Sequence, residues 1–120
     1  MSYVDGFVVP VPESNLKQYR TMSQKAGKIW KEHGALHYVE AVGDDLDPQW
    51  ALSFKKPFKP KPGETIVFSF IIYKSRADRD RINKKVMSDP RMNKLVESGA
   101  EMPFDMKRMC YGGFKSIVDM

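Results

Sequence analysis

Alternating apolar and polar positions predict four β-strands along the chain, over residues 3–11, 35–42, 65–73 and 106–118. The 65–73 segment has the clearest pattern, because every second residue in it is apolar and bulky. The 106–118 segment contains two adjacent glycines. A glycine pair inside a strand indicates a bulge, or a close approach of another group to the backbone.

Apolar residues at helical spacing predict a helix over residues 14–33, which Gly34 ends. Ser75 is a predicted N-cap for a second helix, because a side-chain oxygen there can accept a hydrogen bond from the first turn. Asp89-Pro90 ends that helix and starts a short third one, which we expect to end at Gly99.

The predicted order of elements is β-α-β-β-α-β, with one short extra helix. This order is that of the split βαβ arrangement, so we expect an α+β protein with a ferredoxin-like fold and an antiparallel sheet. At 120 residues the chain is the usual size of one domain, and we assign residues 1–120 to a single domain. The 44–64 connection is long and proline-rich, which is typical of an arm that has a function or contacts a partner.

The two faces of the 65–73 strand differ, and the difference predicts their partners. We expect the uniformly apolar face to meet the helices. The other face is mixed, yet it is too apolar for plain solvent, so we expect it to meet a second copy of the chain. The first face consists of Ile66, Phe68, Phe70 and Ile72, and the second of Thr65, Val67, Ser69, Ile71 and Tyr73.

Composition places the chain among ordinary globular proteins, with 42% hydrophobic and 29% charged residues. The single cysteine, Cys110, excludes an internal disulfide and favours a reducing compartment. The first residues lack the basic start of a signal peptide, and no apolar run is long enough to span a membrane. We therefore expect a cytoplasmic protein with no membrane partner.

Four long segments resemble the YbaA-like family of short bacterial proteins: YVDGFVVPVP (3–12), HGALHYVEAVGDD (33–45), GETIVFSFIIYKSRADRDRINKKVMSDPRM (63–92) and MPFDMKRMCYGGFK (102–115). The resemblance implies a dimeric α/β barrel, and therefore a homodimer. It also implies an architecture similar to that of cofactor-free monooxygenases and muconolactone-isomerase-like enzymes, so we expect no cofactor. The family has no established function and no catalytic residues to transfer to this chain.

Glu40 is the polar residue that stands out, because it shares a predicted strand face with Leu36, Tyr38 and Val42. A carboxylate on an apolar face can be a general base with a raised pKa, or an anchor for a ligand. Alternatively it pairs with an Arg, Lys or Tyr for structural reasons, or lies exposed at the end of the barrel. Arg76 and Arg108 are candidate partners.

The favoured hypothesis is a protein that binds or transforms a small organic molecule without a cofactor; whether it is an enzyme stays open. Its predicted site consists of Tyr38, Glu40, Trp50, Arg76 and Tyr111, since aromatic residues with polar groups often line such pockets, and Arg76 can pair with a carboxylate. Packing in the core or at an interface is the alternative role of these aromatics. The eight methionines either fill gaps or form an adaptable surface.

A second hypothesis follows from the basic run Lys55–Lys61, which contains Phe58. Cations with an interleaved aromatic are typical of RNA-binding or regulatory modules, and the net charge of +5 is compatible with such a partner. A solvated arm, or one that embraces a partner subunit, is the alternative. A third hypothesis is a purely structural or stress-related dimer.

The remaining reactive residues favour structural roles. His33 and His37 are four residues apart, but Gly34 breaks the helix between them, so we expect no metal site. Neighbouring cations can lower the pKa of Cys110, yet a cysteine within a strand is more often a small buried side chain. The aspartates near residue 45 indicate a solvated turn.

Overall fold

A computed structural model describes residues 1–97 and 102–120. The described strands are β1 (Tyr3–Pro12), β2 (His37–Val42), β3 (Glu64–Tyr73) and β4 (Cys110–Lys115). They form one antiparallel sheet in the order β2-β3-β1-β4. The central strands β1 and β3 pair over their whole length. The predicted α+β, ferredoxin-like fold is confirmed.

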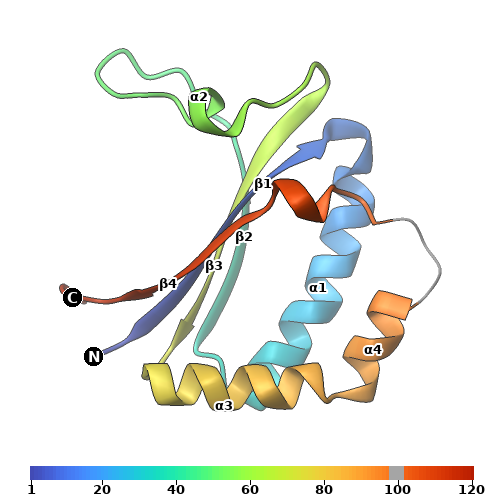
Figure 1. Cartoon of the computed structure of the whole chain (residues 1–120), viewed down its shortest axis with the longest axis vertical. Coiled ribbons are helices and arrows are strands. Elements are labelled where there is room, and N and C mark those ends of the chain that lie inside the picture. The colour runs from blue at the N-terminus through green and yellow to red at the C-terminus, as the bar shows by residue number, and fades with distance from the viewer. Residues whose placement is uncertain (98–101) are drawn as a thin grey trace.

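The described helices are α1, α2, α3 and α4, with the short 3-10 turns η1 and η2. In Figure 1, α1, α3 and α4 lie on one side of the sheet, and the small α2 lies on the other. Among the described residues, no helix is long and apolar enough to cross a membrane. The bounds are η1 Glu13–Asn15, α1 Leu16–His33, α2 Lys55–Phe58, α3 Arg76–Met87, α4 Pro90–Glu97 and η2 Met106–Arg108.

The first helix starts at Leu16 and not at residue 14 as expected, because Glu13–Asn15 form the 3-10 turn η1, whereas two other expected helix ends are confirmed. Gly34 ends α1 with a φ of 120°, a conformation that glycine adopts without steric cost. The Ser75 hydroxyl accepts a hydrogen bond from the Asp78 N–H at 3.1 Å and caps α3. The expected end of α4 at Gly99 lies outside the described residues.

The prediction for the two faces of β3 was wrong, because it is the mixed face that meets the helices. Val67 and Tyr73 on that face are 0% exposed, whereas Phe68 on the uniformly apolar face is 44% exposed. Ser69, the buried polar residue of the mixed face, lies directly opposite Glu40 of β2 in the sheet. An apolar strand face indicates that something buries it. It does not indicate whether helices or a second subunit do so.

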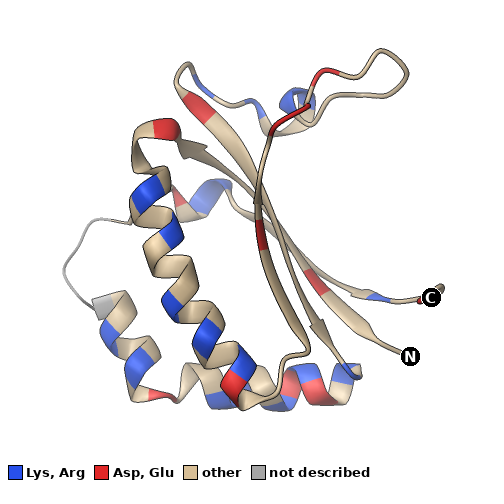
Figure 2. Ribbon diagram, turned by 180° about the vertical axis from the view of Figure 1, so that it is seen from behind, with Lys and Arg blue, Asp and Glu red and all other residues tan. Residues whose placement is uncertain are grey.

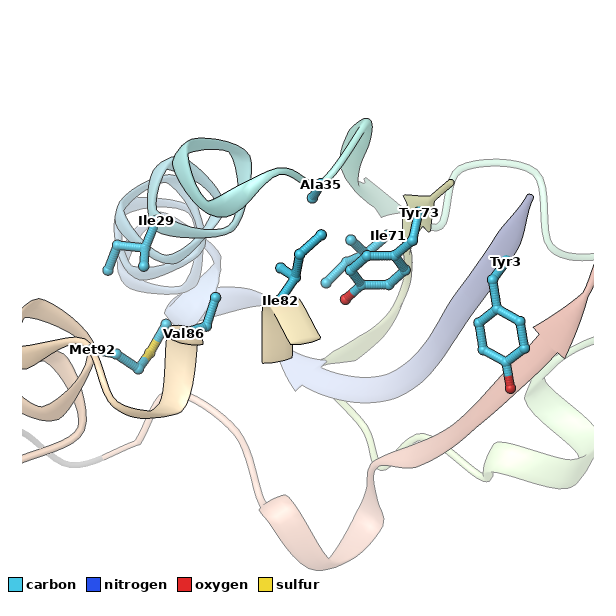
Figure 3. Packing of buried hydrophobic residues seen from close by; sticks show 8 residues of the cluster. All are labelled: Tyr3, Ile29, Ala35, Ile71, Tyr73, Ile82, Val86 and Met92. Atoms are coloured by element: carbon cyan, nitrogen blue, oxygen red, sulfur yellow. The ribbon is translucent and has the colours of Figure 1, made fainter. Parts of the chain in front are cut away.

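The buried core lies between the sheet and the helices (Figure 3). Ile82 and Val86 reach in from α3 and are fully buried, and they meet Ile29 of α1 and Tyr73 of β3. A second buried cluster near the other end of α1 joins Tyr19 to Val9, Val11, Val67 and Phe104. Both clusters use the same face of the sheet, so the position of α1 is fixed along its whole length.

The last strand is shorter than the expected 106–118. The Asp105 side chain accepts a hydrogen bond from the Lys107 N–H at 3.0 Å, which holds η2 and delays the strand until Cys110. Gly113 confirms the predicted close approach, because a Cβ there would lie 2.5 Å from the Tyr3 hydroxyl oxygen. Cys110 is exposed, so its expected burial within the subunit was wrong: it is the first residue of the edge strand β4.

The 44–64 arm folds back against the face of the sheet opposite α1. The Phe54 ring stacks on Phe58 within the arm and meets Phe68 of β3 edge-on, at a centroid separation of 6.5 Å. Lys55 forms an ion pair with Asp47 at 3.0 Å. The arm therefore covers part of that face, and Phe68 remains 44% exposed beside it.

Replacing Ile82 with Ala tests the core. Ile82 is 0% exposed, so Ile82→Ala should lower the free energy of unfolding by about 2–5 kcal/mol. Met87 lies on the same helix and is 57% exposed, so Met87→Ala should change it by no more than about 0.5 kcal/mol. Urea denaturation measures both values, and equal losses would contradict the assignment of the buried side of α3.

Candidate functional site

Glu40 lies at the centre of a polar cluster between β2 and α1. Its Oε1 accepts a hydrogen bond from the Tyr19 hydroxyl at 2.7 Å, and its Oε2 accepts one from the Tyr38 hydroxyl at 3.1 Å. Tyr19 is buried, and the other two residues are half-buried. A buried polar group left unpaired costs about 1–3 kcal/mol, so the two phenols hold the carboxylate on this face. We call these three residues the Glu40 cluster.

Local sequence explains how the cluster forms. Alternation along β2 places Tyr38 and Glu40 on the same face, toward α1. Gly27 lets the α1 backbone lie against the Tyr38 ring, because a Cβ at that position would come within 2.6 Å of it. Tyr19 projects from the buried side of α1, together with Ser23 and Gly27. Helix and strand are therefore close enough for both phenols to reach one carboxylate.

Burial raises the pKa of Tyr19 and of Tyr38 above the ordinary tyrosine value, and the negative charge of Glu40 raises both further. Both hydroxyls therefore stay protonated well beyond neutral pH. They therefore remain hydrogen-bond donors to the carboxylate at neutral pH.

An apolar cavity of about 260 Å³ adjoins the Glu40 cluster. It is bounded by α1, α4, the sheet and the segment that follows residue 101. A cavity of this size suits a small organic molecule. Polar atoms at its wall come from the Glu40 cluster, Ser23 and Ser69. The apolar lining includes Phe7, Met22, Ala26, Trp30, Ile71, Met92, Leu95, Met102, Phe104, Met106 and Met109.

Of the five residues predicted to form one site, the structure brings only Tyr38 and Glu40 together. Trp50 is 90% exposed on the arm, and Arg76 lies at the start of α3 beside the N-terminal residues. The expected arginine partners of Glu40 are also elsewhere, since Arg108 pairs with Glu64 at 2.7 Å. The partners of Glu40 are two tyrosines, which is one of the pairings that the sequence left open, and neither candidate arginine pairs with it.

Tyr111 belongs to a different buried cluster, on β1, β4 and α3. Its hydroxyl donates to the Asp5 carboxylate at 3.1 Å and accepts from Arg79 Nη1 at 2.6 Å. Asp5 is 1% exposed and pairs with Arg79 at 3.2 Å. The Arg79 guanidinium also lies 4.9 Å from the centre of the Tyr3 ring. Asp5 and Arg79 therefore neutralise each other's charge, which favours a structural role.

Tyr19 is the residue of the Glu40 cluster that sequence reasoning missed. Its position on the apolar stripe of α1 indicates burial, but says nothing about the partner of its hydroxyl. The signal that does exist is a pair: one carboxylate on an apolar strand face, and one phenol on the apolar face of the neighbouring helix. Asp5 gives a similar signal, because it shares a strand face with Tyr3 and Phe7 in an otherwise apolar strand.

The other candidates occupy separate places. His33 forms a 2.8 Å contact with Asp89 and joins the end of α1 to the turn before α4. Within the described part of the chain, no group of three or more His, Cys, Asp or Glu residues could hold a metal ion. RNA binding by Lys55–Lys61 stays a prediction, with the charge of Lys55 engaged by Asp47.

The Glu40 cluster can accept a hydrogen bond or a proton from a molecule in the cavity. Each carboxylate oxygen has two acceptor positions and uses one for a phenol, which leaves one per oxygen for a ligand. The apolar walls lower the local polarity around Glu40 and so strengthen such a contact. Hydrogen bonding to a polar group of an otherwise apolar ligand is the chemistry that this arrangement supports.

Comparison with known proteins is consistent with this geometry and assigns no activity. The family model described as "Protein of unknown function (DUF1428)" matches residues 2–106. The "Uncharacterized protein YbaA" of Escherichia coli K12 is 49% identical over 119 residues, which cover 99% of each chain, and that of Shigella flexneri is equally similar. The resemblance inferred from the four segments is confirmed.

Solved structures support the fold. The structure of Rv0793 from Mycobacterium tuberculosis aligns with a TM-score of 0.58 and 11% identity, over 99% of this chain and 98% of that one. A NIPSNAP family protein of unknown function from Agrobacterium tumefaciens gives 0.57 and 12%, over 96% and 87%. A protein from an uncultured marine organism, described as dimeric and ferredoxin-like, gives 0.52 and 13%, over 100% and 98%. At these identities the similarity shows the fold alone.

The tyrosines of the Glu40 cluster predict a loss of stability at alkaline pH. Their folded-state pKa values are raised above 10.0, so their contribution is complete below pH 10 and is lost as the pH rises beyond it, where the unfolded chain releases protons first. Each tyrosine should contribute a slope of up to about 1.4 kcal/mol per pH unit. Urea denaturation between pH 8 and 11 measures the slope.

The double variant Tyr19→Phe with Tyr38→Phe isolates this contribution, because lysines titrate equally in both proteins. The variant should be less stable at pH 8, since Glu40 loses both donors. Its stability should then fall less steeply above pH 10 than that of the wild type. Parallel curves would show that the two phenols are not held protonated by the fold.

Proposed function

The chain belongs to the DUF1428 family of proteins of unknown function, and we propose that it binds a small, largely apolar organic molecule in the cavity beside Glu40. One observation carries the proposal: a carboxylate with two phenol donors borders a cavity whose other walls are almost entirely apolar. A wall of this kind binds the body of a ligand by burial and orients it through one polar group.

The methionines support a ligand of this kind. Five of the eight, all in the described part of the chain, line the cavity: Met22, Met92, Met102, Met106 and Met109. Methionine is unbranched and polarizable, so a cavity lined by it adapts to ligands of different shape. These side chains come from α1, α4 and the segment after residue 101, so a ligand would contact elements that are far apart in the sequence.

A neutral fluorescent probe tests the proposal. N-phenyl-1-naphthylamine becomes strongly fluorescent in apolar surroundings, so it should bind the wild-type protein with saturation at one site per chain. Ala26 lines the cavity from α1, and Ala26→Leu should lower the affinity at least tenfold by filling it. Met102→Trp, at the 37% exposed rim, should do the same with less strain on the core.

Met87→Trp is the matched control, because Met87 is exposed on α3 and does not line the cavity. It should leave probe binding unchanged. If the folded wild-type protein does not bind the probe, or if both cavity variants bind it as the wild type does, the proposal is wrong.

The protein also pairs, in our proposal, with a second copy of itself through the face of the sheet opposite α1. That face presents Phe68 at 44% exposure and Phe114 at 62% exposure, and apolar surface of this kind is usually covered. Phe114 lies over the glycines of β1 and β4, where its ring comes within 3.4 Å of a Cβ built at Gly6. A neighbour of the same fold is described as dimeric, which supports pairing of two copies.

Sedimentation equilibrium tests the dimer. The wild type should sediment as a dimer at micromolar concentration, and Phe68→Asp should sediment as a monomer, because it buries a charge in the interface. Met87→Asp places the same charge on the helical side and should leave the dimer intact. A monomeric wild type, or a dimeric Phe68→Asp variant, would contradict this part of the proposal.

A further inference from the structure

A second, larger cavity lies on the other side of the Glu40 cluster, between α1 and the edge strand β2. This α1–β2 groove has a volume of about 950 Å³. It shares Tyr19, Ser23, Tyr38 and Glu40 with the apolar cavity, so the two adjoin at the Glu40 cluster. Glu40 therefore borders an almost wholly apolar cavity on one side and a larger groove with more polar lining on the other.

Cations line the groove along α1. Lys17, Arg20, Lys28 and Lys31 all border it, and their successive spacings of three, eight and three residues place them on one side of the helix. Glu40 is the only acidic residue among its described lining residues. In Figure 2, blue bands of Lys and Arg follow α1, and a red band lies on the neighbouring strand β2. The groove therefore attracts anions.

These cations have few partners of their own. No described carboxylate forms an ion pair with Lys17, Arg20 or Lys28. Lys31 donates to the Leu36 carbonyl at 2.7 Å, so its charge is not neutralised. The α1 sequence contains five Lys or Arg and a single acid, Glu32, which pairs with Arg91 of α4. Like charges along one helix side repel each other, and a bound anion would relieve that repulsion.

We infer that the α1–β2 groove holds the anionic group of an amphiphilic small molecule, such as an aromatic carboxylate, whose apolar part lies in the cavity beyond Glu40. The inference rests on the proposed function and adds the chemical class of the ligand. Arg20 and Lys28 attract the anion, while the negative charge of Glu40 keeps it on the groove side. Tyr19 and Tyr38 line both the cavity and the groove, so such a ligand contacts both of their side chains.

A pair of ligands of the same shape tests the inference. 2-Naphthoate and 2-naphthamide differ mainly in charge, and titration calorimetry at low salt measures the affinity of each. The wild type should bind the carboxylate about tenfold more tightly than the amide. Because the attraction is between partly exposed charges, 0.5 M salt should remove most of this preference.

The double variant Arg20→Gln with Lys28→Gln should bind both ligands with affinities within about twofold of each other. The control is Lys25→Gln with Lys94→Gln, which removes the same net charge from exposed positions that line neither cavity. The control should keep the preference of the wild type. Equal affinities in the wild type, or a preference that survives Arg20→Gln with Lys28→Gln, would overturn the inference.

Different results would rule out the anion site in the groove and the ligand site in the apolar cavity. If the amide and the carboxylate bind equally well, and Ala26→Leu weakens both, the cavity site stands and only the anion is excluded. If neither ligand nor the neutral probe binds, the proposed function itself is wrong. Retention of a single-stranded oligonucleotide that Arg20→Gln with Lys28→Gln releases, and that Ala26→Leu does not affect, would make the groove a nucleic-acid site and overturn the inference.

Discussion

The pairing of β1 with β3 over their full length is the constraint on which the rest of the structure depends. Its register places Tyr3 opposite Tyr73 and Val9 opposite Val67, so that the buried residues of both strands share one face. A shift of one residue would turn that face to the other side. β2 pairs with the other edge of β3, and this register places Glu40 opposite Ser69. The position of β3 therefore also sets the position of the candidate site.

The two faces of the sheet differ in what packs against them. On one side the helices and the sheet enclose a core, the Asp5–Arg79 pair and the cavity beside Glu40. On the other side the arm, through Phe54, covers part of an apolar surface that keeps Phe68 accessible. On the enclosed side, buried polar groups are tolerated because they have hydrogen-bond or ion-pair partners. The opposite side presents apolar side chains such as Phe68. This division explains why the more polar face of β3 is the buried one.

Much of the fold could be predicted, because local signals determine it: alternation gave the strands, and Gly34 and Ser75 gave helix ends. The site was accessible only in part. Glu40 and Tyr38 share one strand, so their proximity follows from a period of two, whereas Tyr19 reaches Glu40 through a helix–strand contact that no local pattern encodes. Trp50 was grouped with them by residue type alone, and it lies exposed on the arm.

Methionine methyl NMR tests the central claim, the cavity beside Glu40, most directly. The chain labelled at its methionine methyl groups should give eight signals, and N-phenyl-1-naphthylamine should shift those of Met22, Met92, Met102, Met106 and Met109. Met87 lies outside the cavity, as do the terminal methionines Met1 and Met120, and these three signals should stay in place. Shifts confined to these three, or no shifts at saturating probe, would contradict the account.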